Sequence, residues 1–136
     1  MKNTLKPFGF IAFVAVISFS MIACGDDGQG DLLNGTWDRG DIVITFSGSN
    51  GVFTEIKTNS TTWLPVLNSG SINIGDRKFR NISYDGNLRW TGQELTYATT
   101  TAFAGGNWER ATLTISGNIL TVETENATGP GTYTRQ

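Results

Sequence analysis

The fold of this chain is decided by residues 111–123, which read ATLTISGNILTVE. Apolar and polar side chains alternate on both sides of Ser116-Gly117-Asn118. Successive side chains of a β-strand point to opposite faces, so a period of two predicts strands with one buried face. Glycine and asparagine accept the positive φ angles that tight hairpin turns require. The stretch therefore predicts a β-hairpin.

The same pattern recurs along the chain from Asn34 onward, and no stretch keeps a helical period. Runs rich in glycine, asparagine and serine separate the alternating segments at 47–51, 85–87 and 92–93. Threonine is abundant, and its β-branched side chain suits the solvent face of a pleated sheet. Some of the expected segments will merge. The expected strands are 35–38, 41–47, 52–57, 62–67, 70–74, 77–84, 88–91, 94–98, 107–116, 119–125 and 131–135.

These consecutive short strands predict an all-β domain. Two architectures suit them, a sandwich and a closed barrel. The barrel is favoured because closure removes the exposed edges that a small sheet would carry. We therefore expect a small antiparallel up-and-down barrel of about eight to ten strands.

Composition bounds the chemistry. The chain has 136 residues, one Cys, no His, and 10 Lys and Arg against 12 Asp and Glu. This length suits one domain. Without histidine, the usual general base of serine and cysteine hydrolases and the commonest zinc ligand are missing. A lone cysteine excludes an internal disulfide and a CxxC site. The near-neutral balance argues against a dedicated nucleic-acid binder, and we expect no cofactor and no metal.

The amino terminus has the pattern of a targeting segment. Lys2 and Lys6 precede an uncharged, mostly apolar run over residues 8–23. A membrane-spanning helix needs about 20 apolar residues, so this shorter run is typical of a signal helix that is removed. A permanent single-span anchor is the alternative.

Residues 21–24, Met-Ile-Ala-Cys, end this segment. They resemble the lipobox of bacterial lipoproteins, with Met21 in place of the usual leucine. The resemblance implies cleavage between Ala23 and Cys24 and a lipid on the Cys24 thiol. An ordinary secretory signal with a chance cysteine is the alternative. Removal of residues 1–23 would leave 8 basic against 12 acidic residues.

The segment that follows, 24–33, is expected to be a flexible lipid tether, and 34–136 the barrel domain. Residues 25–31 are rich in glycine and aspartate and have no apolar side chain. The aspartates lack the ligand alternation and closing glutamate of an EF-hand calcium loop. The residues after Cys24 leave the choice between inner and outer membrane open.

The two ends of the expected barrel carry short motifs. Residues 34–37 read Asn-Gly-Thr-Trp, and residues 131–135 read Gly-Thr-Tyr-Thr-Arg. This pairing resembles the lipocalin-like (calycin-type) superfamily of small up-and-down barrels. The resemblance implies that Trp37 plugs one end of the barrel and that Arg135 packs across it. Together with the hairpin at 113–118, the ending is also similar to a group of uncharacterised spirochaete lipoproteins. The chain is shorter than a typical lipocalin, which argues against a roomy cavity.

Five aromatic side chains are the candidates for a binding rim, because aromatic residues at a barrel mouth can stack on sugars or apolar ligands. Filling of the core is the alternative. The five are Trp63, Tyr84, Trp90, Tyr97 and Trp108.

The charged residues give weaker signals. Nothing in the spacing of the glutamates at 55, 94, 109, 123 and 125 selects a catalytic pair, so we expect them on solvated faces. Arg77, Lys78 and Arg80 surround Phe79 and are expected at a solvated strand end, with anion binding as the alternative. No catalytic residue is assigned, and we expect that the protein is not an enzyme.

Together these features predict a lipid-anchored protein of the bacterial cell envelope, on the periplasmic side or the outer surface. The membrane is its partner through Cys24, and the barrel is expected to be monomeric and to bind a small apolar ligand or an envelope protein. The alternative is an adhesion or inhibitor module with a packed, ligand-free interior. The register of each strand decides which face points inward, so the sequence leaves this choice open.

Overall fold

The computed structural model describes residues 25–97 and 106–136. The chain divides into two compact units, Met1–Asp31 and Leu32–Gln136. The signal helix, its cleavage site at Ala23 and the lipidation site at Cys24 lie outside the described residues. A 3₁₀ helix, η1 (Gly25–Leu33), is the first described element, and its last two residues belong to the second unit.

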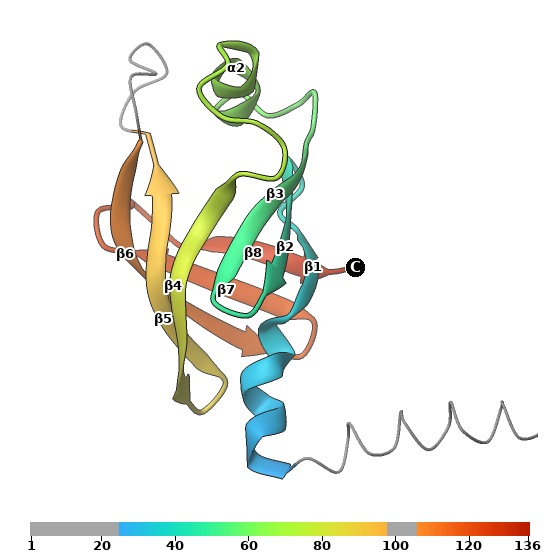
Figure 1. Ribbon diagram of the computed structural model, residues 1–136, viewed down its shortest axis with the longest axis vertical. Helices are drawn as coiled ribbons and strands as arrows, with labels where there is room; N and C mark the ends of the chain where they lie inside the picture. The colour runs from blue at the N-terminus through green and yellow to red at the C-terminus, as the bar shows by residue number, and fades with distance from the viewer. Residues whose placement is uncertain (1–24, 98–105) are drawn as a thin grey trace, which may run out of the picture. The chain divides into compact units, whose positions relative to one another are not determined.

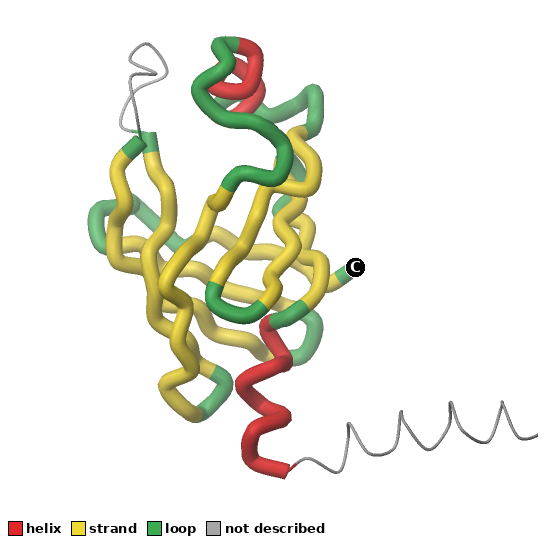
Figure 2. Tube along the Cα trace, in the orientation of Figure 1, coloured by secondary structure: helices red, strands yellow, loops and turns green. Residues whose placement is uncertain are grey.

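The second unit is a closed antiparallel barrel in which strands neighbour one another in chain order (Figure 1, Figure 2). The expected all-β up-and-down barrel is therefore confirmed. Its described strands are β1 (Gly35–Asp38), β2 (Ile42–Ser47), β3 (Asn50–Ile56), β4 (Arg77–Gly86), β5 (Arg89–Thr96), β6 (Asn107–Ser116), β7 (Ile119–Thr124) and β8 (Gly131–Arg135).

The hairpin at 111–123 forms as expected. β6 pairs with β7 from Ala111 opposite Thr124 to Ser116 opposite Ile119, without a register shift. Gly117 lies in the turn with a φ of 60°, which the hairpin requires. The pairing places the buried Leu113 opposite the buried Val122, so both strands contribute the same face to the core.

Two expected strands, 62–67 and 70–74, are wrong. A short helix, α2 (Trp63–Asn68), replaces the first. Ser60 Oγ accepts a hydrogen bond from the Trp63 backbone N–H at 3.1 Å, and Pro65 lies in the first turn, where a helix needs no N–H donor. Trp63 and Val66 are three residues apart, so one helix face buries both.

The second segment, 70–74, is irregular because a side chain satisfies its backbone. The Asp76 carboxylate accepts a hydrogen bond from the Asn73 N–H at 2.8 Å, a local turn that competes with strand pairing. The apolar side chain that suggested a strand, Ile72, is nevertheless buried in the core.

The expected break at residues 92–93 is also wrong, since β5 runs through it and merges two expected strands. A Cβ atom at Gly92 would lie 2.7 Å from Ile82 Cδ1 and 3.0 Å from the Arg80 carbonyl oxygen. This glycine is needed for close approach of β4 and β5 and not for a turn.

The core begins inside the segment that was expected to be a flexible tether. Leu33 is buried, and its carbonyl oxygen accepts a 2.8 Å hydrogen bond from Trp37 Nε1. Leucine supplies the apolar area that the preceding glycines and aspartates lack. The barrel unit therefore starts at Leu32 and not at Asn34.

Large side chains fill the barrel. Ring contacts connect its walls, including Phe46 with Phe79, whose ring centroids are 5.1 Å apart. These contacts show that side chains fill the middle of the barrel. The largest side chains with almost no exposure are Trp37, Trp90, Tyr133, Phe46, Phe53, Lys78, Phe79, Leu33, Ile42, Ile44, Leu113 and Leu120.

The first and last strands close the barrel through a short pairing. Trp37 lies opposite Arg135, and Asp38 opposite Thr134. The Arg135 guanidinium lies 4.2 Å from the Trp37 ring centre and donates hydrogen bonds to the carbonyl oxygens of Asn34, at 3.2 Å, and Leu32. Gly35, with a φ of 123°, leaves room for this arginine.

We expect Trp37→Ala to destabilise the barrel more than Arg135→Ala. Emptying a buried tryptophan site costs about 3–5 kcal/mol, whereas a cation–π contact contributes about 0.5–2 kcal/mol. The double variant should lose less than the sum of the two, because the side chains are in contact. Urea unfolding of the four proteins measures this coupling, and strict additivity would show that the contact contributes nothing to closure.

Candidate functional site

One end of the barrel gathers the ends of β1, β3, β5 and β7, the starts of the strands that follow them, and α2 (Figure 1). We call it the α2 end. Because the strands alternate in direction, Gly35 at the start of β1 lies at the opposite end, and Leu33 precedes it there. The chain thus enters the barrel at the end away from α2.

A half-open pocket of about 320 Å³ lies at the α2 end. Its walls combine charged, hydroxyl and small apolar side chains, and part of it is formed by the β7–β8 loop. The lining residues are Arg39, Lys78, Glu94, Thr96, Val122, Thr124, Ala127, Gly129, Pro130, Gly131 and Tyr133.

A buried ion pair forms the base of this site. Lys78 Nζ donates hydrogen bonds to Glu94 Oε1 and to the Leu95 carbonyl oxygen, both at 2.6 Å. Thr124 Oγ1 donates to the other oxygen of Glu94. Lys78 is 1% exposed and Glu94 8%. Buried charges persist only when they are paired and hydrogen-bonded in this way.

Burial lowers the pKa of Lys78 to about 8, although the charge and hydrogen bond of Glu94 oppose the change. Lys78 Nζ also lies 4.4 Å from the Trp63 ring centre, so α2 covers the ion pair with an aromatic face.

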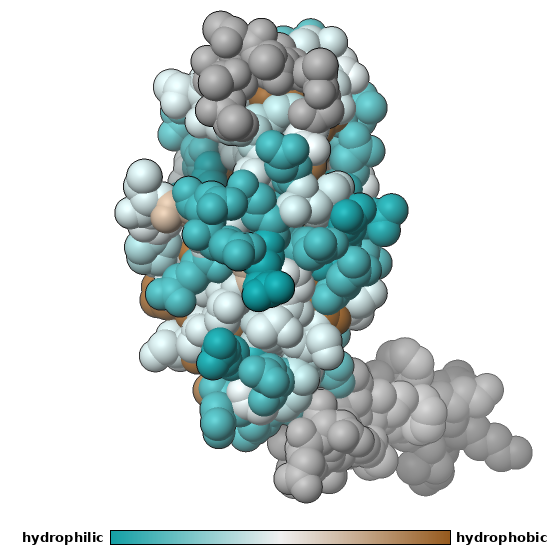
Figure 3. Space-filling view, turned by 90° about the vertical axis from the view of Figure 1, so that its left-hand side faces the viewer, coloured by the Kyte–Doolittle hydropathy of each residue, from teal (hydrophilic) through white to brown (hydrophobic). Residues whose placement is uncertain are grey.

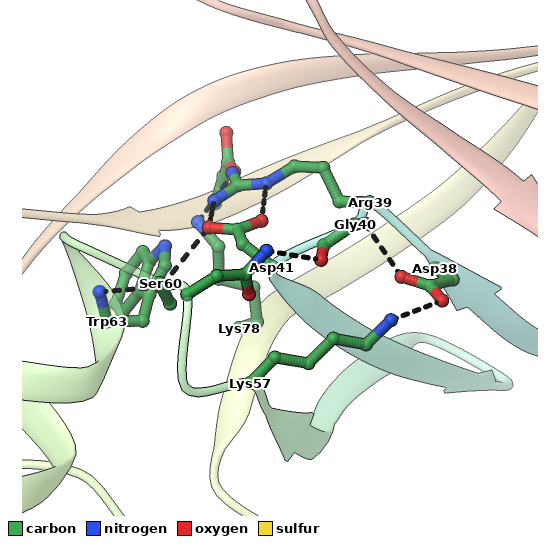
Figure 4. A network of polar contacts seen from close by, with 10 residues as sticks. Asp38, Arg39, Gly40, Asp41, Lys57, Ser60, Trp63 and Lys78 are labelled. Atoms are coloured by element: carbon green, nitrogen blue, oxygen red, sulfur yellow. Dashed lines mark hydrogen bonds and ion pairs between the residues drawn. The ribbon is translucent and has the colours of Figure 1, made fainter.

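A second polar group connects β1 to α2 (Figure 4). Arg39 Nε and Nη2 donate to the two carboxylate oxygens of Asp41, each at 2.7 Å. Ser60 Oγ donates to Asp41 at 3.2 Å and accepts from the Trp63 N–H. Burial alone would raise the pKa of Asp41, but the hydrogen bonds and charge of Arg39 lower it overall. Arg39 is therefore held in a fixed orientation.

Tyr133 contributes an unusual donor. Its hydroxyl group is buried and has no hydrogen-bond partner among the described residues. Arg39 lies beside it, with the guanidinium carbon 5.9 Å from the Tyr133 ring centre. Against the larger effect of burial, the charge and the N–H donors of Arg39 lower the pKa of the hydroxyl. Burial raises the pKa of Tyr133, so the hydroxyl keeps its proton. A buried polar atom without a partner is rare in folded proteins and calls for an explanation.

The five aromatic residues expected at a rim are not brought together. Trp63 and Tyr97 meet edge to face near α2, with ring centroids 5.7 Å apart. Tyr84 and Trp90 meet at 5.1 Å beside the β4–β5 turn, at the opposite end. The Arg80 guanidinium lies 4.0 Å from the Trp108 ring centre. Trp63 and Trp90 are buried, and none of the five lines the pocket.

The sequence analysis missed the charged residues that do line the pocket. Lys78 was expected at a solvated strand end and Glu94 on a solvated face, and both expectations are wrong. Lys78 and Phe79 are consecutive and both buried, which regular alternation does not allow. The pairing of β4 with β3 shifts register at Lys78, between Arg77 and Phe79, and this shift breaks the alternation. The sequence did offer one indication of this site, since Lys78 stands inside a strand next to Phe79 and not at its end.

Comparisons of the chain with protein-family models, curated proteins and solved structures found no significant match. Among residues 25–97 and 106–136, no group of three or more acidic, cysteine or histidine side chains is arranged to hold a metal ion. The helices in this part of the chain are too short or too polar to cross a membrane.

We expect Lys78→Met to destabilise the protein by about 3–5 kcal/mol, because it leaves the Glu94 carboxylate buried without a counter-charge. The double variant Lys78→Met/Glu94→Leu should regain most of this loss, since an apolar pair of similar size replaces both charges. Chemical unfolding measures both. Lys57→Met is the matched control, because Lys57 pairs with Asp38 at 2.7 Å but at the surface. An equal loss in Lys57→Met and Lys78→Met would contradict a buried pair.

The same pair should make stability depend on pH. Between pH 8 and 10.5 the unfolded chain binds a proton at Lys78 that the folded protein has lost, so this residue's contribution to stability rises with pH. The rise amounts to about 3 kcal/mol at about 1.4 kcal/mol per pKa unit. As pH is raised through this window, we expect the free energy of unfolding of the wild type to increase relative to that of Lys78→Met/Glu94→Leu. Urea unfolding of both proteins at each pH measures this difference. A difference that stays constant would contradict the lowered pKa.

Proposed function

We propose that this chain is a lipid-anchored protein of the bacterial cell envelope whose barrel binds a small molecule at its α2 end. The Met-Ile-Ala-Cys motif at 21–24 supports anchoring through Cys24, because it resembles a lipobox. The chain enters the barrel at the end opposite the pocket.

The observation that carries the binding function is the pocket of about 320 Å³, whose lining includes Tyr133. The buried Tyr133 hydroxyl has no hydrogen-bond partner among the described residues. Ligand sites combine a concave wall with a few convergent polar groups, and pockets near 300 Å³ suit small ligands. A bound molecule that accepts a hydrogen bond from Tyr133 would remove the cost of leaving this donor unsatisfied.

The chemistry of the walls favours a polar or amphiphilic ligand over the apolar one suggested by the sequence. Arg39, Lys78 and Glu94 line the pocket, and an apolar molecule against them would leave their remaining polar atoms without water. The apolar interior of the barrel is occupied by side chains such as Trp37 and Phe53, which are fully buried.

That packed interior also favours a second function, an adhesion or inhibitor module that acts through its outer surface. The face of the molecule in Figure 3 is mostly hydrophilic, so a partner there would be held by polar contacts. The two functions differ in their response to small molecules. Only the first gives a melting temperature that rises with the concentration of a small polar compound.

We expect metabolic labelling with a fatty-acid analogue to mark the wild type and not Cys24→Ser, because the thiol of the only cysteine is the acceptor. Ser20→Ala is the matched control, since it changes the same apolar segment outside the motif and should be labelled fully. Equal labelling of Cys24→Ser and the wild type would exclude lipid attachment at Cys24.

A further inference from the structure

The pocket at the α2 end has more hydrogen-bond donors than its own residues use. Arg39 carries five N–H donors, of which the two on Nε and Nη2 bond to Asp41. Lys78 carries three and donates two, and the Tyr133 hydroxyl donates none to the described residues.

The carboxylates beside these donors are already engaged. Asp41 accepts from Arg39 twice and from Ser60, and Glu94 accepts from Lys78 and Thr124. Among the described residues, the groups left over are therefore donors, and an acceptor bound in the pocket would satisfy them.

The geometry of Arg39 narrows the kind of acceptor. Asp41 occupies the guanidinium edge formed by Nε and Nη2, which leaves the edge formed by Nη1 and Nη2. Two parallel N–H groups on such an edge match the two oxygens of a carboxylate, and hydrogen bonds to an ionised acceptor are about twice as strong as neutral ones. Tyr133, beside Arg39, supplies a further donor.

The pocket also has apolar lining residues. They are Val122, Ala127 and Pro130. These side chains offer no hydrogen bonds and suit a hydrocarbon group. A cavity of about 150 Å³ accommodates benzene, so about 320 Å³ leaves room for one small ring or a short chain together with a carboxylate.

We infer that the pocket binds a small organic acid as its carboxylate, held by Arg39 and Tyr133, with its hydrocarbon part against Val122, Ala127 and Pro130. This inference rests on the proposed function, since it names the ligand class of the same site. Asp41 and Ser60 act as positioning residues, because they hold the guanidinium in place.

Tyr133→Phe tests the inference, because it removes the one hydroxyl and keeps the ring. The full-length lipoprotein in lipid nanodiscs is titrated calorimetrically with benzoate and with benzamide, its neutral counterpart. Benzoate should bind the wild type more tightly than benzamide, and Tyr133→Phe should weaken benzoate binding about tenfold or more, the effect of one charge-assisted hydrogen bond. The melting temperature of this variant should not fall, since it removes a buried polar atom without a partner.

Tyr84→Phe is the matched control. Its hydroxyl accepts a hydrogen bond from the Leu88 N–H beside the β4–β5 turn, away from the pocket, so benzoate affinity should stay unchanged. Benzoate binding that Tyr133→Phe leaves intact, or that is absent from the wild type, overturns the inference. Benzamide binding that equals or exceeds benzoate binding overturns the carboxylate class and leaves the proposed pocket standing. A wild type that takes up no fatty-acid label would overturn the proposed anchoring and would leave the inference about the pocket standing.

Discussion

The contact between Trp37 and Arg135 joins the two ends of the barrel, and the rest of the domain depends on that closure. Two residue pairs connect β1 to β8, and the Gln136 N–H adds one hydrogen bond to the Thr36 carbonyl oxygen, so the backbone pairing that closes the sheet is short. The arginine adds a cation–π contact and two hydrogen bonds to carbonyl oxygens just before β1. Without closure, both strands would have unpaired edges, and the side chains between them would lose one wall of the core.

At the α2 end the barrel departs from what stability alone would favour. A buried lysine and glutamate occupy positions where apolar side chains would cost less free energy, and a tyrosine hydroxyl there has no hydrogen-bond partner among the described residues. The opposite end contains Trp37 and Leu33, where the indole N–H of the first donates to the carbonyl oxygen of the second. Polar groups that cost stability at one end and not the other are typical of a binding site.

Much of the fold could be predicted from local pattern. The 111–123 hairpin needs only its alternation and its glycine turn, and neither depends on distant residues. The strand predicted at 62–67 is wrong because the hydrogen bond to Ser60 and the burial of Trp63 and Val66 favour a helix there. The candidate site was largely missed, because Lys78 and Glu94 are sixteen residues apart in the sequence. Neither residue indicates a buried site until the fold pairs them. Lys78 is buried where the register between β3 and β4 shifts, and alternation does not reveal such a shift.

The sequence by itself determined an all-β chain and most of its turns, because these follow from side-chain period and turn chemistry. The pairing of Trp37 with Arg135 was predicted only through the resemblance of their motifs to lipocalin-like barrels. The tertiary structure decided which charges lie inside. Arg39, Lys78, Glu94 and Tyr133 come from four different strands or their ends and meet only when the barrel closes. The physical reason is that burial and hydrogen-bond satisfaction are properties of the assembled neighbours, which no single stretch of chain contains.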